Sequence, residues 1–307
     1  MYDDIGCMTT LPRDYVSTLT SMGIKAKTFA KVTPFFSTHY NNRDHRKILV
    51  IDGKAAFSGG INLADEYINK EERFGKWKDN CFLQGDAVRN YTLMFLQLWN
   101  TTVSQDAKLY QPYVSVRSDR VPREGDGFII PYGDGPHSPV SVAQSIYLNI
   151  IHSAVDYVHI MTPYLVLDDE MLNALKRAAK SGIDVRILLP YIPDKKTVNL
   201  IGKTYYPELL EAGVHIYEYT PGFVHSKVVE ADGNIAAVGT INLDFRSLYL
   251  HYECACLIFE NDVLKDITED FHRTFADSHR ITMSDYKKMN LMKRFAGRVL
   301  RVFAPQV

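Results

Sequence analysis

The sequence lacks any long apolar run. A helix that crosses a bilayer needs roughly 18 consecutive apolar residues, and no such run occurs in the 307 residues. The N-terminus, MYDDIGCMTT, has neither the basic start nor the apolar stretch of a signal peptide. We therefore expect this chain to have no membrane span of its own, which excludes an integral membrane protein anchored through these residues.

The sequence also lacks an excess of charge. Its 35 Lys and Arg residues nearly balance 36 Asp and Glu residues, so the formal net charge is −1. General nucleic-acid-binding proteins usually carry a basic excess, and we expect no nucleic-acid partner. Hydrophobic residues make up 46% of the chain, which is enough to bury the core of one large or two medium domains.

Cysteine is scarce. Only four cysteines occur, and none forms a C-x-x-C pair, which disfavours a zinc site or a redox motif. Cys254 and Cys256 are two residues apart in an apolar run, so they are expected on one face of a strand as small buried side chains.

What the sequence does contain is an internal repeat. The segment HRKILVIDGKAAFSGGIN, 45–62, matches HSKVVEADGNIAAVGTIN, 225–242, with His, Lys, Asp, Gly and Asn at identical offsets. The shared positions are His45, Lys47, Asp52, Gly59 and Asn62 in the first copy and His225, Lys227, Asp232, Gly239 and Asn242 in the second. Each copy has Asp-Gly between two apolar runs, which predicts a strand, a turn and a second strand.

The flanking segments repeat as well. After each motif come a further predicted strand and a helix, at 78–85 and 87–100 in the first copy and at 252–259 and 263–277 in the second. Before the second motif, 141–154 and 168–182 read as helices and 158–165 and 184–191 as strands, a β-α-β alternation typical of an α/β domain. Only 44 residues precede His45, so the first domain is expected to lack roughly 50 residues, comparable to a β-α-β unit.

We predict two domains, residues 1–120 and 121–307, joined by the Pro- and Gly-rich stretch 114–139, which reads as a linker or an active-site loop. The G-D-G-P sequence in that stretch does not continue as a phosphate-binding loop.

Each motif places an imidazole and an ammonium on one face of a strand, because His and Lys are two residues apart. One such pair means little, but two matched copies indicate phosphoryl chemistry. A neutral imidazole can attack phosphorus, and a protonated imidazole can donate to the leaving alkoxide. Two lysines can hold the phosphate oxygens. This chemistry needs no metal and no cofactor, and none is expected.

The pattern H-x-K-x(4)-D-x(6)-G-x-x-N, present twice, resembles the signature of the phospholipase D superfamily. Segments such as FGKWKDN, MTPYLVLDDEMLNALKRAAKSGIDVRILLP and RFAGRVLRVFAP are similar to bacterial cardiolipin synthases, and the similarity covers essentially the whole chain. The resemblance implies an α/β fold of two α-β-α sandwich domains related by a pseudo-twofold axis, with one active site shared between them.

The resemblance also implies roles for individual residues. It makes His45 the nucleophile and His225 the general acid, with Lys47 and Lys227 on the phosphate and Asn62 and Asn242 binding substrate. It makes Asp79 and Glu253, on the strands after the motifs, the carboxylates that orient the histidines; Asp65 and Glu66 are weaker candidates with an ordinary explanation as helix-start acids. Asp52 and Asp232 belong to the motif and count as catalytic candidates, although an Asp-Gly turn favours Asp regardless of chemistry.

His251 departs from the family, which usually has Asn at that place, and the change is expected to alter hydrogen bonding around the site. Ala231 replaces a bulkier or acidic residue, with little effect expected.

The implied reaction joins two phosphatidylglycerol molecules into cardiolipin through a covalent phosphohistidine. Two alternatives stay open. One is hydrolysis by the same chemistry, on phospholipid or, with less support, on nucleic acid; the other is a shortened, weakly active lipid-binding protein.

The C-terminal segment 287–301 has six Lys or Arg residues and no acid, interleaved with apolar residues. It predicts either a basic amphipathic helix lying on an anionic membrane or a helix packed on the second domain, with Phe295, Leu300 and Phe303 in the core. The expected partners are thus phosphatidylglycerol and an anionic membrane surface, on the cytoplasmic side.

Overall fold

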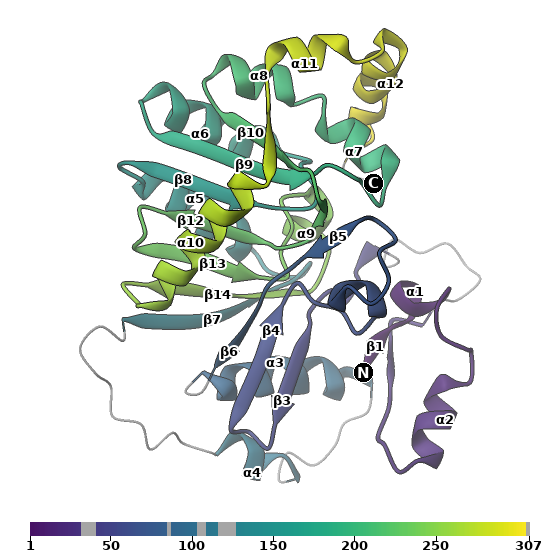
Figure 1. Ribbon diagram of the computed structural model, residues 1–307. Coiled ribbons are helices and arrows are strands. Elements are labelled where there is room, and N and C mark those ends of the chain that lie inside the picture. The colour runs from purple at the N-terminus through teal and green to yellow at the C-terminus, as the bar shows by residue number, and fades with distance from the viewer. Residues whose placement is uncertain (32–40, 85–86, 103–108, 116–126, 305–307) are drawn as a thin grey trace.

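The computed structural model describes residues 1–31, 41–84, 87–102, 109–115 and 127–304 (Figure 1). The predicted domain boundary between residues 120 and 121 lies outside these ranges. Among the described residues, no helix combines the length and the apolar character that a membrane crossing requires.

The second half is built on one large mixed sheet with the strand order β15-β10-β9-β8-β12-β13-β14-β7. Its strands are β7 (Phe128–Asp134), β8 (Tyr157–Met161), β9 (Asp184–Pro190), β10 (His215–Tyr219), β12 (Val228–Ala231), β13 (Ile235–Gly239), β14 (Glu253–Phe259) and β15 (Ser278–Ile281). The strands β8, β9 and β10 run parallel, as the β-α-β alternation predicts, and the remaining pairs are antiparallel.

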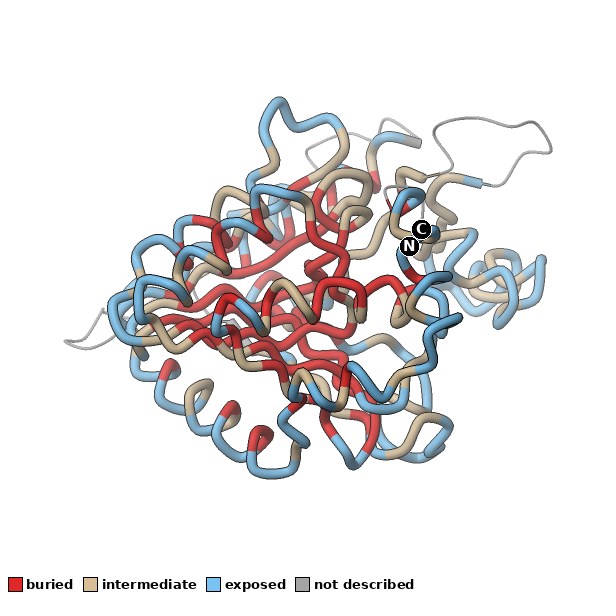
Figure 2. Tube along the Cα trace, turned by 90° about the horizontal axis from the view of Figure 1, so that it is seen from above, coloured by how far each residue is buried: buried red, intermediate tan, exposed pale blue. Residues whose placement is uncertain are grey.

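Helices cover both faces of this sheet, giving the α-β-α sandwich expected from the sequence (Figure 1). The helices are α5 (Val142–Ser153), α6 (Asp169–Lys180), α7 (Lys196–Gly202), α8 (Tyr206–Glu211), α9 (Phe245–Tyr249), α10 (Val263–Ala276), α11 (Met283–Lys288) and α12 (Leu291–Arg301). The larger core cluster contains residues of α5, α6, α7 and α8, whereas α10 closes the opposite face with Phe271 and Phe275. Figure 2 shows the buried residues concentrated along the strands between these layers.

Local sequence signals explain these elements. In α6, Asp168 caps the helix by accepting from the Met171 backbone N–H at 2.7 Å, and the chain leaves the helix through Gly182 at φ 97°. Both Asp-Gly turns adopt left-handed backbone, with φ of 53° at Asp52 and 54° at Asp232, so each motif forms the predicted hairpin, β3–β4 or β12–β13.

The first half carries the corresponding hairpin in a smaller sheet of order β3-β4-β6, with β1 and β2 as a separate parallel pair. Its elements are β1 (Tyr2–Asp3), α1 (Asp4–Cys7), α2 (Tyr15–Ser21), β2 (Thr28–Phe29), β3 (Ile48–Ile51), β4 (Ala55–Gly59), η2 (Asp65–Ile68), β5 (Lys76–Lys78), β6 (Cys81–Gln84), α3 (Val88–Thr102) and α4 (Gln111–Val114). In the second half, by contrast, the hairpin β12–β13 belongs to the large sheet, because β8 pairs with β12 on one side and with β9 on the other. The expectation that residues are missing from the first domain stays a prediction.

A short parallel ladder ties the two halves together. β5 of the first half pairs with β11 (Gly222–Val224) of the second, so that Lys78 lies opposite Val224. Lys78 also forms an ion pair with Asp270 on α10, at 2.5 Å. The two residues that follow these strands, Asp79 and His225, are therefore brought side by side.

The stretch 114–139 is not wholly a linker, which corrects that part of the sequence interpretation. Residues 128–134 form β7 at the edge of the large sheet, paired with β14. The β-branched and aromatic run FIIPY suits a strand, and an edge position tolerates Pro131, which lacks a backbone donor.

Candidate active site

The two motif histidines are held by backbone hydrogen bonds that cross between the halves. The backbone N–H of His45 donates to the Tyr252 carbonyl at 3.0 Å, and that of His225 donates to the Lys78 carbonyl at 2.7 Å. Each acceptor directly precedes one of the two expected carboxylates, Glu253 or Asp79. The arrangement is symmetric between the copies, so the halves meet at the motifs.

The two carboxylates also contact histidines of the opposite half. His45 Nδ1 lies 2.9 Å from Glu253 Oε1, and His225 Nδ1 lies 2.8 Å from Asp79 Oδ2. Each histidine is thus oriented by the carboxylate that follows the other motif. The family resemblance pointed to both carboxylates, but nothing in the sequence indicated that they exchange partners.

Both carboxylates are buried and held as anions. Burial by itself would raise the pKa of Glu253, but the charge and hydrogen bond of His45, together with the nearby His251, hold it well below its usual range. Burial opposes ionisation of Asp79 too, and the hydrogen bond and charge of His225 still lower its pKa. An ionised carboxylate only accepts hydrogen bonds, so Nδ1 of each ring carries the hydrogen and Nε2 is left for the reaction.

Burial keeps both imidazoles neutral. It lowers the pKa of His45 to about 4 against the attraction of Glu253, and the Lys47 charge acts in the same direction as burial. It lowers the pKa of His225 to about 3, with the Lys227 charge again adding to the effect. A neutral imidazole with a free Nε2 is the nucleophilic form.

The two motif lysines lie close enough to the histidines for their charges to lower the pKa values of both rings. Lys47 Nζ donates to the His45 carbonyl at 2.5 Å, and Lys227 Nζ donates to the His225 carbonyl. Burial, opposed by the attraction of Asp79 and aided by the Lys47 charge, lowers the pKa of Lys227 to about 7. Burial also lowers the pKa of Lys47. Lys227 is buried and Lys47 is partly buried, and two ammonium groups whose charges act on each other favour a bound anion.

The motif asparagines occupy equivalent positions. Asn62 Nδ2 donates to the Tyr67 hydroxyl at 2.5 Å, and Asn242 Nδ2 donates to Ser247 Oγ at 3.1 Å. The Oδ1 atom of Asn242 is buried without a hydrogen-bond partner. Their expected contact with substrate remains a prediction.

The motif aspartates lie in the hairpin turns rather than among these groups. Asp232 accepts three backbone N–H bonds from Val155, Asp156 and Tyr157, at 2.7–2.9 Å. It thereby ties its turn to the start of β8. Asp52 is exposed in the corresponding turn. This geometry supports the structural explanation of these residues over a direct part in catalysis.

Sequence reasoning missed the aromatic surroundings of His225. The rings of Tyr67, Trp77 and Phe223 lie with centroids 5.3, 5.2 and 5.9 Å from the His225 ring. Trp77 was visible two residues before Asp79, on the same face of the strand, but only the β5–β11 pairing brings it to His225.

His45 has a different neighbour. The His251 ring lies 5.6 Å from it, centroid to centroid, and His251 Nδ1 is 3.7 Å from Glu253 Oε1. The departure at position 251 thus falls beside the first histidine. Within the described part of the chain, His45, His251 and Glu253 are one group whose ligand atoms lie within 4.8 Å of one another, close enough to hold a metal ion.

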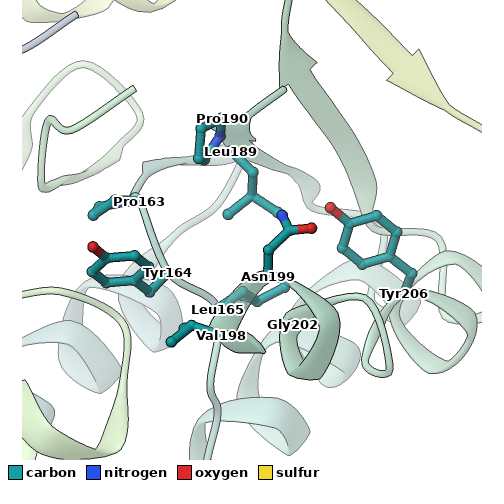
Figure 3. A pocket seen from close by; sticks show the side chains of 9 residues that line it. All are labelled: Pro163, Tyr164, Leu165, Leu189, Pro190, Val198, Asn199, Gly202 and Tyr206. Carbon is teal, nitrogen blue, oxygen red and sulfur yellow. The ribbon is translucent and has the colours of Figure 1, made fainter. Parts of the chain in front are cut away.

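A small hollow lies beside the cluster, at the ends of β8 and β9 and against α7 (Figure 3). It is lined by Pro163, Tyr164, Leu165, Leu189, Pro190, Val198, Asn199, Gly202 and Tyr206. The Tyr164 hydroxyl donates to Asp194 at 2.6 Å. Burial raises the pKa of Tyr67 above its usual range, and the charges of Asp79, Glu66 and, least of all, Asp194 act in the same direction. The motif histidines and lysines do not line this hollow.

Comparisons with known proteins point to the same family as the sequence motifs. The family described as "Cardiolipin synthase, PLD-like domain" matches residues 147–275. The chain is 38% identical over 307 residues to cardiolipin synthase 2 of Bacillus anthracis and 39% identical over 308 residues to a cardiolipin synthase of Geobacillus kaustophilus, covering 99% of this chain and 59% and 60% of theirs. A Streptococcus mutans protein described only as uncharacterized is 51% identical over 306 residues, which is 66% of its length.

A solved structure supports the fold. Phosphatidylserine synthase of Haemophilus influenzae superposes with a TM-score of 0.67 at 15% identity, over 94% of this chain and 75% of that chain. The chain described here spans about three fifths to two thirds of the length of the curated relatives it matches. With its paired His-x-Lys motifs, the chain thus carries a PLD-like cardiolipin synthase domain over residues 147–275 and has bacterial cardiolipin synthases among its homologues.

Proposed function

We propose that the protein is a phosphatidyltransferase that makes cardiolipin from two phosphatidylglycerol molecules through a phosphohistidine. The observation that carries the proposal is the crossed pairing of His45 with Glu253 and of His225 with Asp79. It gives two imidazoles with oriented Nε2 atoms next to the two motif lysines, as a two-step phosphoryl transfer requires.

In the first step, His45 Nε2 attacks phosphorus and the bond from phosphorus to the glycerol oxygen breaks. His225 donates a proton from Nε2 to the departing oxygen. Because burial and the lysines keep His225 neutral in the free site, it must gain this proton when the anionic phosphodiester binds and raises its pKa.

In the second step, His225 takes the proton of the glycerol hydroxyl of a second phosphatidylglycerol. That oxygen attacks phosphorus, the phosphorus–nitrogen bond breaks and His45 is released. Lys47 and Lys227 offset the charge on the phosphate oxygens in both steps. The partners on this proposal are phosphatidylglycerol and the anionic membrane surface that contains it, on the cytoplasmic side.

The test is product analysis with phosphatidylglycerol vesicles and the purified protein. Cardiolipin and glycerol are expected in equal amounts by thin-layer chromatography. Phosphatidic acid as the sole lipid product would show hydrolysis instead of transfer.

The roles of the histidines are tested by trapping the adduct and locating it by mass spectrometry. His45→Ala should form no adduct. His225→Ala should still form one from a phosphodiester with a good leaving group, because that oxygen needs no proton. His152→Ala, on the exposed end of α5, is the matched control. An adduct on His225 in the unaltered protein would reverse the two roles.

A further inference from the structure

Helix α12 presents its apolar side to solvent. The residue buried in the helix is Gly297, where a Cβ would come within 2.9 Å of the Leu200 carbonyl and of Thr204 Cγ2 on and after α7. The exposed apolar side chains of α12 and the turn after it are Leu291 (73% exposed), Met292 (75%), Phe295 (67%), Val299 (46%), Val302 (75%) and Phe303 (54%).

These six side chains, which we call the α12 apolar face, lie together. At 3.6 residues per turn they fall within an arc of about 120°, centred opposite Gly297. The core alternative expected for Phe295 and Phe303 is therefore wrong, whereas Leu300 does pack against the main core. A helix that serves only to cover a domain buries its apolar side, so the outward orientation indicates a partner.

The charge around this face has one sign. Residues 286–307 contain six Lys or Arg residues and no Asp or Glu. Arg294 and Arg301 stack on the protein itself, over the rings of Tyr286 and Tyr205, whereas Lys293 and Arg298 are exposed on either side of the apolar arc. The partner must therefore be apolar in its interior and negative at its surface.

We propose that the α12 apolar face inserts into the surface of an anionic bilayer, with Lys293 and Arg298 at the level of the lipid phosphates. Exposed apolar side chains rimmed by basic residues suit the boundary between headgroups and acyl chains. The proposal does not depend on the reaction proposed above, because it concerns attachment and not turnover.

The position of α12 relative to the site is consistent with this contact. α12 packs on α7, and the loop from β9 to α7 leads to the site, since the Ile192 backbone N–H donates to the Gly222 carbonyl at 3.4 Å. Four more exposed apolar side chains adjoin site residues in the sequence or lie in that loop: Leu63 (106%) after Asn62, Ile68 (67%) after Tyr67, and Tyr191 (54%) and Ile192 (37%) between β9 and α7. In the view of Figure 1, α7 lies between α12 and β5, so a bilayer at α12 would lie on the side of α7 away from β5.

The experiment is co-sedimentation of the full chain with vesicles of phosphatidylglycerol or of phosphatidylcholine. We expect binding to the anionic vesicles, weakening with added salt. Phe295→Ser and the double variant Lys293→Ala/Arg298→Ala should each bind about tenfold more weakly or worse. Phe128→Ser is the matched control, because Phe128 is 61% exposed at the start of β7 and outside this face. Its binding should be unchanged.

Three results would overturn the proposal. The first is unchanged vesicle binding by Phe295→Ser, and the second is equal loss in Phe128→Ser. The third is a chain that self-associates through this face, with Phe295→Ser monomeric in sedimentation but bound to vesicles as before. Turnover of short-chain phosphatidylglycerol dissolved in detergent separates the two proposals. It should be unaffected by Phe295→Ser, and its absence in every form of the protein would contradict the reaction but not the attachment.

Discussion

Single residues make the two histidines unequal, although their motifs match. His225 is enclosed by the rings of Tyr67, Trp77 and Phe223, whereas His45 has the polar ring of His251 beside it. Trp77 and His251 stand two residues before Asp79 and Glu253, respectively. Two groups of one chemical type acquire different protonation behaviour when their environments differ, so this pair of positions provides a physical basis for dividing the roles.

The crossed carboxylates give a prediction at this scale. Asp79→Asn and Glu253→Gln should each lower kcat by about 10²- to 10⁴-fold, because the imidazole loses the partner that fixes its tautomer. A substrate with a good leaving group should restore adduct formation in Asp79→Asn, which impairs the acid, but not in Glu253→Gln, which impairs the nucleophile. Rapid-mixing measurement of the adduct distinguishes them.

Asp262→Asn, at an exposed ion pair before α10, is the control for loss of a carboxylate. Equal rescue of both site variants by the good leaving group would contradict the assignment of His45 and His225 to separate roles.

Among the elements, the β5–β11 ladder has the greatest consequence for the site. It pairs three residues of one half with three of the other, directly before Asp79 and His225. Gly222 lets the two backbones approach, since a Cβ at that position would clash with the Lys76 backbone. A glycine inside a strand often marks such a close approach.

Gly222→Ala should therefore separate the two strands. We expect a loss of about 1–3 kcal/mol in the free energy of unfolding, the usual cost of overpacking. Adduct formation should fall as well, because Asp79 and His225 no longer meet. Urea denaturation and adduct trapping measure the two effects.

Gly133→Ala in β7 is the matched control, because its Cβ would meet the Glu253 carbonyl and Met94 Sδ at 3.6 Å, an ordinary contact. A Gly222→Ala protein as stable and active as this control would show that the ladder does not hold the site.

The folded protein holds two histidines neutral and two carboxylates ionised, and a fall in pH disfavours all four of these states. The pKa values of His45 and His225 are lowered, chiefly by burial, to about 4 and about 3 from the ordinary 6.5. Below pH 6.5 the unfolded chain binds protons that the folded chain does not, so the folded state loses stability as the pH falls. The lowered pKa values of Asp79 and Glu253 act in the same direction.

We expect the free energy of unfolding to decrease between pH 6.5 and pH 4, with each histidine contributing a slope of up to about 1.4 kcal/mol per pH unit. Urea denaturation at a series of pH values measures it. His225→Gln should show a shallower decrease over this range than the unaltered protein, whereas His152→Ala should match the unaltered protein. Parallel curves for the His225→Gln and unaltered proteins would contradict the buried, neutral state of His225.

The sequence alone determined the elements and the chemistry that depend on short-range patterns. Two matched His-x-Lys motifs, their Asp-Gly hairpins and the helices and strands of the second half follow from spacing, periodicity and turn residues that act within about a dozen positions. The family resemblance further pointed to Asp79 and Glu253 as the orienting carboxylates.

Only the tertiary structure decided which carboxylate serves which histidine, because the partners lie 208 and 146 residues apart. It likewise decided the aromatic surroundings of His225, the edge position of β7 and the direction that the apolar face of α12 points. Helical periodicity places apolar residues on one side of a helix, but whether that side meets a core or solvent depends on how distant elements pack. No local pattern carries that information.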